Sequence, residues 1–120
     1  MPDKLVSVVD DDESLREAIV GLLRSMDYDA RGFGSAEAFL AERDGGWSCV
    51  ISDVQLPGLS GFDMVRRMRE LGRGVPAIMI TARAGDALEA EADAAGAFCV
   101  LRKPFESSAL LDCVERALGA

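Results

Sequence analysis

The segment Cys49-Val50-Ile51-Ser52-Asp53-Val54-Gln55-Leu56-Pro57-Gly58 decides how the rest of the chain is arranged. Its first three residues form a short apolar run with two β-branched side chains, which favours a buried strand over a helix. Pro57-Gly58 is typical of a loop. We therefore expect Asp53 where a strand leaves the core, and in an open α/β sheet ligands bind at that edge. Our hypothesis is that Asp53 is a nucleophile that accepts a phosphoryl group.

Four further segments are predicted to be strands, because apolar, β-branched or aromatic residues dominate them and Gly, Pro or helix-like stretches separate them. The weakest contains Arg31 and Gly32, and this polar interruption favours a position at the edge of the sheet. In chain order the four segments are Leu5–Val9, Tyr28–Phe33, Ala77–Ile80 and Phe98–Leu101.

The segments between the strands have helical character. Ser35 is a candidate N-cap for a short helix. Ala and Glu dominate Asp86–Ala95, where Leu88 is the only large aliphatic residue, so its apolar stripe is thin. Elsewhere the inward residues recur at helical spacing. They are Leu15, Ile19, Leu22, Leu23 and Met26; Ala36, Phe39 and Leu40; Phe62, Val65, Met68, Arg69 and Leu71, with Met64 beside them; and Leu110, Leu111, Val114 and Leu118 within Glu106–Leu118.

Strands and helices thus alternate along the whole chain. Strands that are apolar almost throughout are buried on both faces, which indicates a parallel sheet with helices on both sides. Right-handed crossovers restrict such a chain to a few doubly wound topologies. The length of 120 residues suits one independent core, so we predict a single α/β domain over residues 1–120.

The composition limits the classes of partner. The formal net charge is -8 and there is no His, so the surface repels nucleic acid and anionic lipid. An acidic surface suits a divalent cation or a basic partner, although it also simply promotes solubility. We expect no membrane association, because the sequence has neither a signal peptide nor an apolar run of membrane-spanning length.

Cysteine usage indicates the compartment. The three cysteines, Cys49, Cys99 and Cys113, form no CxxC pair and their number is odd. We therefore expect buried, reduced thiols in a cytoplasmic protein. A zinc site is not favoured without His or paired Cys.

Polar residues follow several of the predicted strands. Asp10-Asp11 follows the first strand, Asp53 ends the third, Thr81 ends the fourth and Lys103 comes shortly after the fifth. In a parallel sheet these ends share one edge, so the side chains should converge. Repulsion between such carboxylates raises pKa values or recruits a cation, and oxygen ligands alone suit Mg²⁺. Positioning and charge neutralisation are what phosphoryl transfer requires.

Read singly, these residues have simpler interpretations. Asp10-Asp11, like Asp12 and Glu13, could begin a helix and complement its dipole. Asp53 could form a turn before Pro57, Thr81 could merely end a strand, and Lys-Pro is common in surface turns. Their joint placement at successive strand ends favours the functional interpretation.

Five motifs in register resemble the response-regulator receiver domain of bacterial two-component signalling, in the style of nitrogen-fixation and nodulation regulators. They are Val8-Val9-Asp10-Asp11; Ser52-Asp53 with Leu56-Pro57-Gly58 and Gly61; Ile80-Thr81-Ala82; Gly96-Ala97; and Lys103-Pro104-Phe105-Glu106. The resemblance spans the chain and implies a flavodoxin-like, five-stranded sheet of order 2-1-3-4-5.

The resemblance also implies roles. Asp53 would accept phosphate from a sensor histidine kinase, in a module that catalyses its own phosphorylation and dephosphorylation. Mg²⁺ would be held by Asp11, Asp53 and the backbone carbonyl of Gln55, with Asp10 binding directly or through water. Lys103 would pair with Asp53 and then with the phosphoryl oxygens. The peptide bond between Lys103 and Pro104 would be cis. Thr81 would bond the phosphoryl group.

The resemblance further implies that the fourth helix, fifth strand and fifth helix report phosphorylation. The first helix near Ser14 and Arg16 would receive the kinase. The effector, for example a DNA-binding domain, would lie outside this chain, and the chain would be a monomer or a phosphorylation-dependent homodimer. The chain also differs from the family's common pattern. Val100 replaces a common aromatic, and Gln55 and Arg83 stand where side chains of the family influence phosphate lifetime.

Three rival functions remain. A haloacid-dehalogenase-like phosphohydrolase also uses an Asp nucleophile with Mg²⁺, but it needs an acid two residues later, where this chain has Gln55. A flavodoxin-like cofactor module needs a Gly-, Ser- or Thr-rich loop, where this chain has acidic residues. A pseudo-receiver that only binds partners would not need Asp53, Thr81 and Lys103 together.

Overall fold

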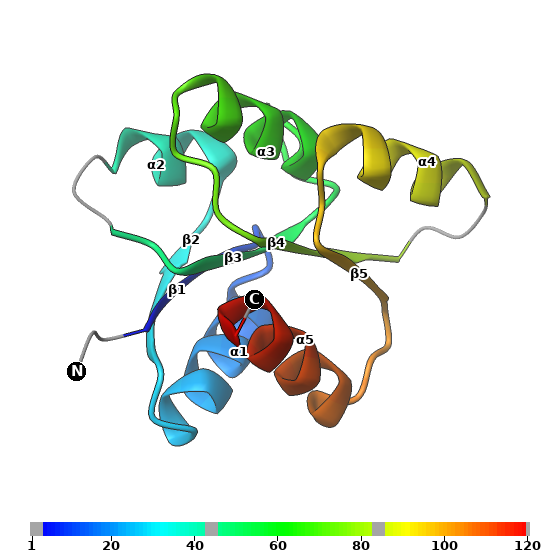
Figure 1. The fold of residues 1–120 in the computed structure, drawn as a ribbon. Coiled ribbons are helices and arrows are strands. Elements are labelled where there is room, and N and C mark those ends of the chain that lie inside the picture. Colours follow the sequence, from blue (N-terminus) through cyan, green and yellow to red (C-terminus); the bar gives the residue numbers. More distant parts are fainter. Residues whose placement is uncertain (1–3, 43–45, 83–85, 120) are drawn as a thin grey trace.

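The computed structural model describes residues 4–42, 46–82 and 86–119. All neighbouring strands are parallel, and the sheet order is β2-β1-β3-β4-β5. This confirms the doubly wound α/β fold and the 2-1-3-4-5 order, with the weak strand at an edge (Figure 1). The strands are β1 (Leu5–Val9), β2 (Asp29–Phe33), β3 (Cys49–Asp53), β4 (Ala77–Thr81) and β5 (Cys99–Arg102).

Helices cover both faces of the sheet. Figure 1 shows α1 and α5 on one face and α2, α3 and α4 on the other. Side chains on successive residues of a strand point to opposite faces, so each layer of helices packs on its own set of strand residues. The helices are α1 (Glu13–Ser25), α2 (Ala36–Ala41), α3 (Gly61–Glu70), α4 (Asp86–Ala95) and α5 (Ser107–Gly119).

Two hydrophobic clusters result from this alternation. In β3, Cys49 and Ile51 pack with α1 and α5, whereas Val50 packs with the other three helices. All five residues of β3 are buried, as are all five of β4. The central strands therefore fix the fold, and the residues at their carboxyl ends are positioned by a rigid base.

The helix starts follow the sequence signals. Asp12 caps α1 by accepting the Leu15 N–H at 3.2 Å, and Ser35 caps α2 by accepting the Ala38 N–H at 3.1 Å. Asp12 is thus a helix-start residue, as its simpler interpretation predicted. Gly96 follows α4 with φ 85° and donates its N–H to the Ala92 carbonyl, which is the left-handed ending expected of glycine.

Some details of the predicted stripes were wrong. Leu71 is 49% exposed and Met26 is 52% exposed, although both were placed on buried stripes. Both exposed residues are C-caps, so the chain turns away before their side chains reach the sheet. Phe98 precedes β5 and is 41% exposed, although we predicted it as the first residue of that strand.

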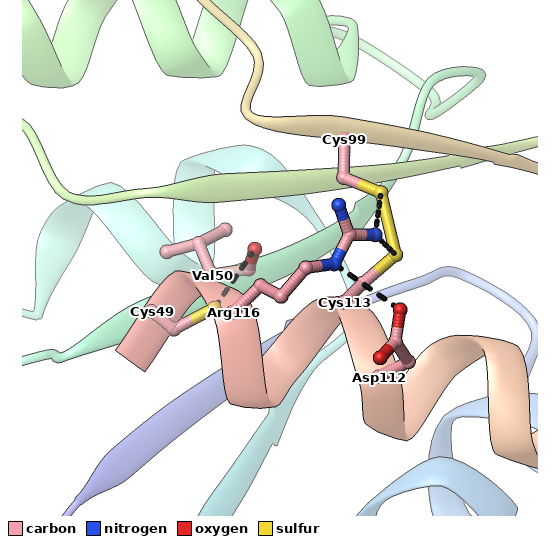
Figure 2. The surroundings of a disulfide bond; sticks show 6 residues. All are labelled: Cys49, Val50, Cys99, Asp112, Cys113 and Arg116. Carbon is pink, nitrogen blue, oxygen red and sulfur yellow. Dashed lines mark hydrogen bonds and ion pairs between the residues drawn. A yellow bond between two sulfur atoms is a disulfide. The ribbon is translucent and has the colours of Figure 1, made fainter. Parts of the chain in front are cut away.

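The expectation of three buried thiols was also wrong in part. Cys49 is a buried free thiol, but Cys99 of β5 and Cys113 of α5 form a disulfide (Figure 2). Their Cα atoms lie 6.6 Å apart, within the range that a disulfide spans. The folded contact between strand and helix creates this pairing, and no spacing pattern in the sequence reveals it.

Gly61, the first residue of α3, lies close to the end of β3. A Cβ atom there would overlap the backbone oxygen of Asp53 and the side chain of Met79. We expect Gly61→Ala to destabilise the fold by about 1–3 kcal/mol, because a buried backbone atom has little room to move. The matched variant Gly21→Ala lies in α1, where a Cβ meets nothing within 4 Å, and should stabilise by about 0.5–1 kcal/mol.

Urea unfolding of both variants measures these differences directly. Equal urea midpoints for Gly61→Ala and the wild-type protein would contradict this prediction, because they would show that the backbone at the end of β3 can shift at little cost.

Candidate functional site

Parallel pairing brings several strand ends to one edge of the sheet. Val9 is opposite Ser52, and Asp53 is opposite Ile80, so the residues that follow β1 and end β3 are neighbours. Asp10 donates its N–H to the Phe33 carbonyl at 3.0 Å, which continues the ladder for one more residue. The sheet therefore positions the acidic residues without help from a long loop.

Three carboxylates cluster at this edge. Oxygen atoms of Asp10, Asp11 and Asp53 all lie within 4.8 Å of one another. Asp10 is 1% exposed and Asp53 is 7% exposed, whereas Asp11 is open to solvent. The predicted convergence of these residues is confirmed as geometry.

Asp53 is held through both of its carboxylate oxygens. Oδ1 accepts a hydrogen bond from the backbone N–H of Gln55 at 2.9 Å, and Oδ2 accepts a hydrogen bond from Lys103 Nζ at 2.8 Å. Because β3 is rigid and both oxygens are bonded, the carboxylate has one defined orientation. It lies at the solvent boundary, where an incoming group can reach it.

Asp10 is held less completely. Its Oδ1 accepts the Asp12 N–H at 2.9 Å. Its Oδ2 is buried without a hydrogen-bond partner among the described residues, and Lys103 Nζ lies 3.8 Å away. Burial is the main cause that raises the pKa of Asp10, and the charges of Asp53 and Asp11 add to it.

Lys103 is the cation of the site. Its peptide bond to Pro104 is cis, as the family resemblance predicted, and its N–H donates to the Thr81 carbonyl at 2.8 Å. Burial lowers the pKa of Lys103, but its bond to Asp53 and the charges of Asp53 and Asp10 raise it by more, so the pKa is raised overall. The ammonium therefore stays charged beside the carboxylates.

Of the remaining predicted residues, Thr81 and Gln55 fall at or near the same edge. Thr81 is the last residue of β4 and is fully buried. Gln55 is exposed two residues after Asp53. Val100 is partly buried in β5 and packs on the cluster beneath α2, α3 and α4. Arg83 lies outside the described residues.

The donor set fits a hard divalent cation. Three carboxylates face one another with a single ammonium between two of them, and one buried oxygen of Asp10 lacks a hydrogen bond within the described segments. A cation there would satisfy that oxygen and reduce the repulsion. All candidate side-chain ligands are oxygens, which Mg²⁺ prefers.

Sequence reasoning missed two residues that support the site. Arg16 donates from Nη1 to the Asp10 carbonyl at 2.9 Å and packs across Gly32, where a Cβ would come within 3.0 Å of its side chain. Glu37 of α2 accepts the Leu59 N–H at 2.9 Å, and this bond lowers the pKa of Glu37. Both anchor backbone near the acidic edge, but neither belongs to a recognisable local motif.

Membrane insertion finds no support in the helices. Within residues 4–42, 46–82 and 86–119, no helix has the length and apolar character needed to cross a bilayer.

Comparison with curated proteins gives relatives named as response regulator proteins or transcriptional regulatory proteins. The chain is 36% identical to the response regulator protein TmoT of Ectopseudomonas mendocina, over 97% of this chain and 53% of that protein. It is 33% identical to the transcriptional regulatory protein FixJ of Rhizobium meliloti, over 98% of this chain and 58% of that protein. The chain thus spans about half the length of the curated relatives it matches.

Solved structures give the same grouping. The chemotaxis protein CheY4 of Vibrio cholerae superposes with a TM-score of 0.92 at 28% identity, covering 98% of this chain and all of that one. FixJ-N superposes with a TM-score of 0.86 at 32% identity, covering 99% and 96% of the two chains. The family model of the response regulator receiver domain matches residues 6–115. With its sheet order, its acidic edge and this match, the chain belongs to the response regulator receiver domain family.

Proposed function

We propose that this chain takes a phosphoryl group from a sensor histidine kinase onto Asp53. The observation that carries the proposal is the contact of Lys103 Nζ with Asp53 Oδ2, at 2.8 Å, beside the buried Asp10. A carboxylate that is fixed at a strand end, lies close to the exposed Asp11 and is paired with a cation is suited to receive an anionic group.

The transfer needs little covalent chemistry from the protein. An oxygen of Asp53 attacks the phosphorus, and the bond from phosphorus to the kinase imidazole nitrogen breaks. The Lys103 ammonium then pairs with the new phosphoryl oxygens, and the Thr81 hydroxyl donates a hydrogen bond to one of them. Attack by water on the phosphorus later breaks the bond between phosphorus and the Asp53 oxygen, which releases inorganic phosphate and restores the carboxylate. The domain therefore turns over its own modification without being a conventional enzyme.

Mg²⁺ is the proposed cofactor. Asp10, Asp11, Asp53 and the backbone carbonyl of Gln55 are its proposed ligands. When bound, the ion neutralises the carboxylates and the incoming phosphoryl charge. A phosphohydrolase would also need a general acid two residues after Asp53, and the amide of Gln55 cannot serve as one.

The response is proposed to pass to α4, β5 and α5. The buried apolar residues described in α4 are one leucine, Leu88, and two alanines, Ala92 and Ala95, so this helix is held by little apolar surface. Elements with few buried contacts shift at low cost. When Thr81 bonds the phosphoryl group, the adjoining segment moves and α4 can follow.

The partners follow from the same proposal. A kinase would dock on α1 near Ser14 and Arg16. This chain spans little more than half of the curated relatives named as transcriptional regulatory proteins, so the effector is proposed to be a DNA-binding domain or separate protein outside it. We propose a cytoplasmic setting, and a monomer that forms a homodimer only when phosphorylated.

Phosphoryl acceptance can be tested with a small acyl phosphate donor and Mg²⁺. We expect a phosphoryl adduct on the wild-type protein and on Asp29→Asn, whose aspartate lies on the exposed edge strand. Asp53→Asn should give none, because the nucleophile is absent. Intact-mass spectrometry at neutral pH is the measurement. An equal adduct on Asp53→Asn, or none on the wild type, would contradict the proposal.

Metal binding should appear in the stability of the fold. Asp10→Asn keeps an acceptor for the Asp12 N–H but removes a buried charge, so in EDTA it should unfold at higher urea than the wild type. Mg²⁺ at a hundred times its dissociation constant should stabilise the wild type by about 2.7 kcal/mol and Asp10→Asn far less. Equal responses to Mg²⁺ would remove Asp10 from the ligand set.

Lys103 should matter more for the response than for acceptance. In Lys103→Ala the nucleophile and the carboxylates that hold Mg²⁺ remain, so the acyl phosphate should still label Asp53. Hydrogen exchange across residues 86–95 should change on phosphorylation in the wild type and in Lys4→Ala, which alters an exposed lysine. It should change little in Lys103→Ala, and an undiminished change there would contradict this role.

A further inference from the structure

A pair of sulfur atoms lies at the junction of β5 and α5, away from the acidic edge. Cys99 is the first residue of β5 and Cys113, 14 positions later in the sequence, lies in the middle of α5. The bond joins the last strand of the sheet to the helix that covers it (Figure 2). The proposed phosphoryl chemistry uses neither sulfur.

The two sulfurs differ in access. Cys113 is 2% exposed, whereas Cys99 is only partly buried on the edge strand. Thiol–disulfide exchange requires a thiolate to reach one sulfur of the bond. An incoming thiolate therefore meets Cys99 first, and Cys113 is the sulfur that is released.

A cation lies beside the sulfur that would be released. Arg116 Nη2 is 3.5 Å from Cys113 Sγ and 4.0 Å from Cys99 Sγ, while its Nε donates to Asp112 Oδ2 at 3.1 Å. Figure 2 shows the guanidinium group against the disulfide. A nearby guanidinium stabilises a thiolate, and a better-stabilised leaving thiolate departs faster. The arrangement favours opening of the bond at Cys99.

We propose that Cys99, Cys113 and Arg116 form a reversible thiol–disulfide modification site that is opened by a dithiol reductant of the CxxC oxidoreductase class. In the first step a reductant thiolate bonds to Cys99 Sγ, the bond between Cys99 and Cys113 breaks, and Cys113 leaves as a thiolate. In the second step the other reductant thiolate attacks its partner sulfur and releases Cys99. The reductant leaves as a disulfide, and a small-molecule disulfide such as glutathione disulfide reverses the change.

The bond state alters how α5 is attached. In the oxidised form a covalent link fastens α5 to β5, whereas in the reduced form apolar packing of residues such as Leu110 and Val114 holds the helix. The site therefore sets the mobility of α5. A consequence for signalling would rest on the proposed function of the α4, β5 and α5 face, but the chemistry of the site does not.

The third cysteine is an internal control. Cys49 is fully buried in β3, and burial raises the pKa of its thiol to about 12, so it stays protonated and unreactive in the folded protein. Figure 2 shows it apart from the sulfur pair. Its label in denaturant reports total protein in each sample.

The test equilibrates the unphosphorylated full chain in buffers with graded ratios of glutathione to glutathione disulfide. After an acid quench, thiols are alkylated in denaturant and counted by peptide mass spectrometry. We expect Cys99 and Cys113 to lose their labels together as the buffer becomes oxidising, while Cys49 keeps its label. Labels that persist on both residues at every ratio, or mixed disulfides with glutathione alone, would overturn the proposal.

Reduction kinetics test the role of Arg116. The rate of thiol–disulfide exchange varies with about the square root of the acid dissociation constant of the thiol. With dithiothreitol as reductant, a tenfold decrease in that constant for the leaving thiol should therefore slow opening by about threefold. We expect this slowing in Arg116→Gln, and no slowing in Asp112→Asn, which removes the carboxylate that shares the guanidinium. Equal rates in the wild type and Arg116→Gln would overturn the role of Arg116.

Hydrogen exchange tests the consequence for the helix. Amides of residues 107–119 should exchange at least about threefold more slowly in the oxidised than in the reduced wild-type protein, since a covalent link suppresses local opening. In Cys99→Ala, which alters a partly exposed position, the two buffers should give the same rates. Because no phosphoryl donor is present, failure here leaves the function proposed for Asp53 untouched. Equal exchange rates for the oxidised and reduced wild-type protein would contradict the proposal that the disulfide restricts the mobility of α5.

Discussion

The bond between Lys103 Nζ and Asp53 Oδ2, 2.8 Å long, is the interaction on which the acidic edge depends. Three carboxylates meet there, and this ammonium lies against two of them. One positive charge cannot balance three negative charges, so the edge carries an excess of negative charge in a partly buried place. That excess opposes folding and at the same time favours a divalent cation. The site is thus arranged for a ligand at a cost to the stability of the ligand-free protein.

The rest of the sheet offsets this cost. The central strands β3 and β4 are buried throughout, and the helix layers on the two faces form separate clusters. Stability is concentrated there, while α4 contributes little apolar contact. A protein built in this way can tolerate repulsion at one edge and movement in one helix without unfolding, because neither disturbs the central strands.

The sequence predicted those features that repeat or that accompany a strand end. Alternating strands and helices fixed the layers, and Asp10, Asp53 and Thr81 were placed at one edge because parallel strands share their carboxyl ends. Predictions failed where an apolar pattern continued past the end of a helix. Leu71 has the spacing of an inward residue, but it is the C-cap of α3 and is exposed. The contact of Arg16 with Asp10 spans six positions and that of Cys99 with Cys113 spans 14, and no local sequence motif marks either of them.

Val100 bears on how a change at the acidic edge travels. It is smaller than an aromatic, has few rotamers and packs on the cluster beneath α4, so it cannot swing far. The backbone offers another route, because Thr81 is opposite Arg102 and its carbonyl accepts the Lys103 N–H at 2.8 Å. A displacement of Thr81 would therefore move the end of β5 directly. The disulfide fastens the start of the same strand to α5, which places the two proposed controls at opposite ends of one short element.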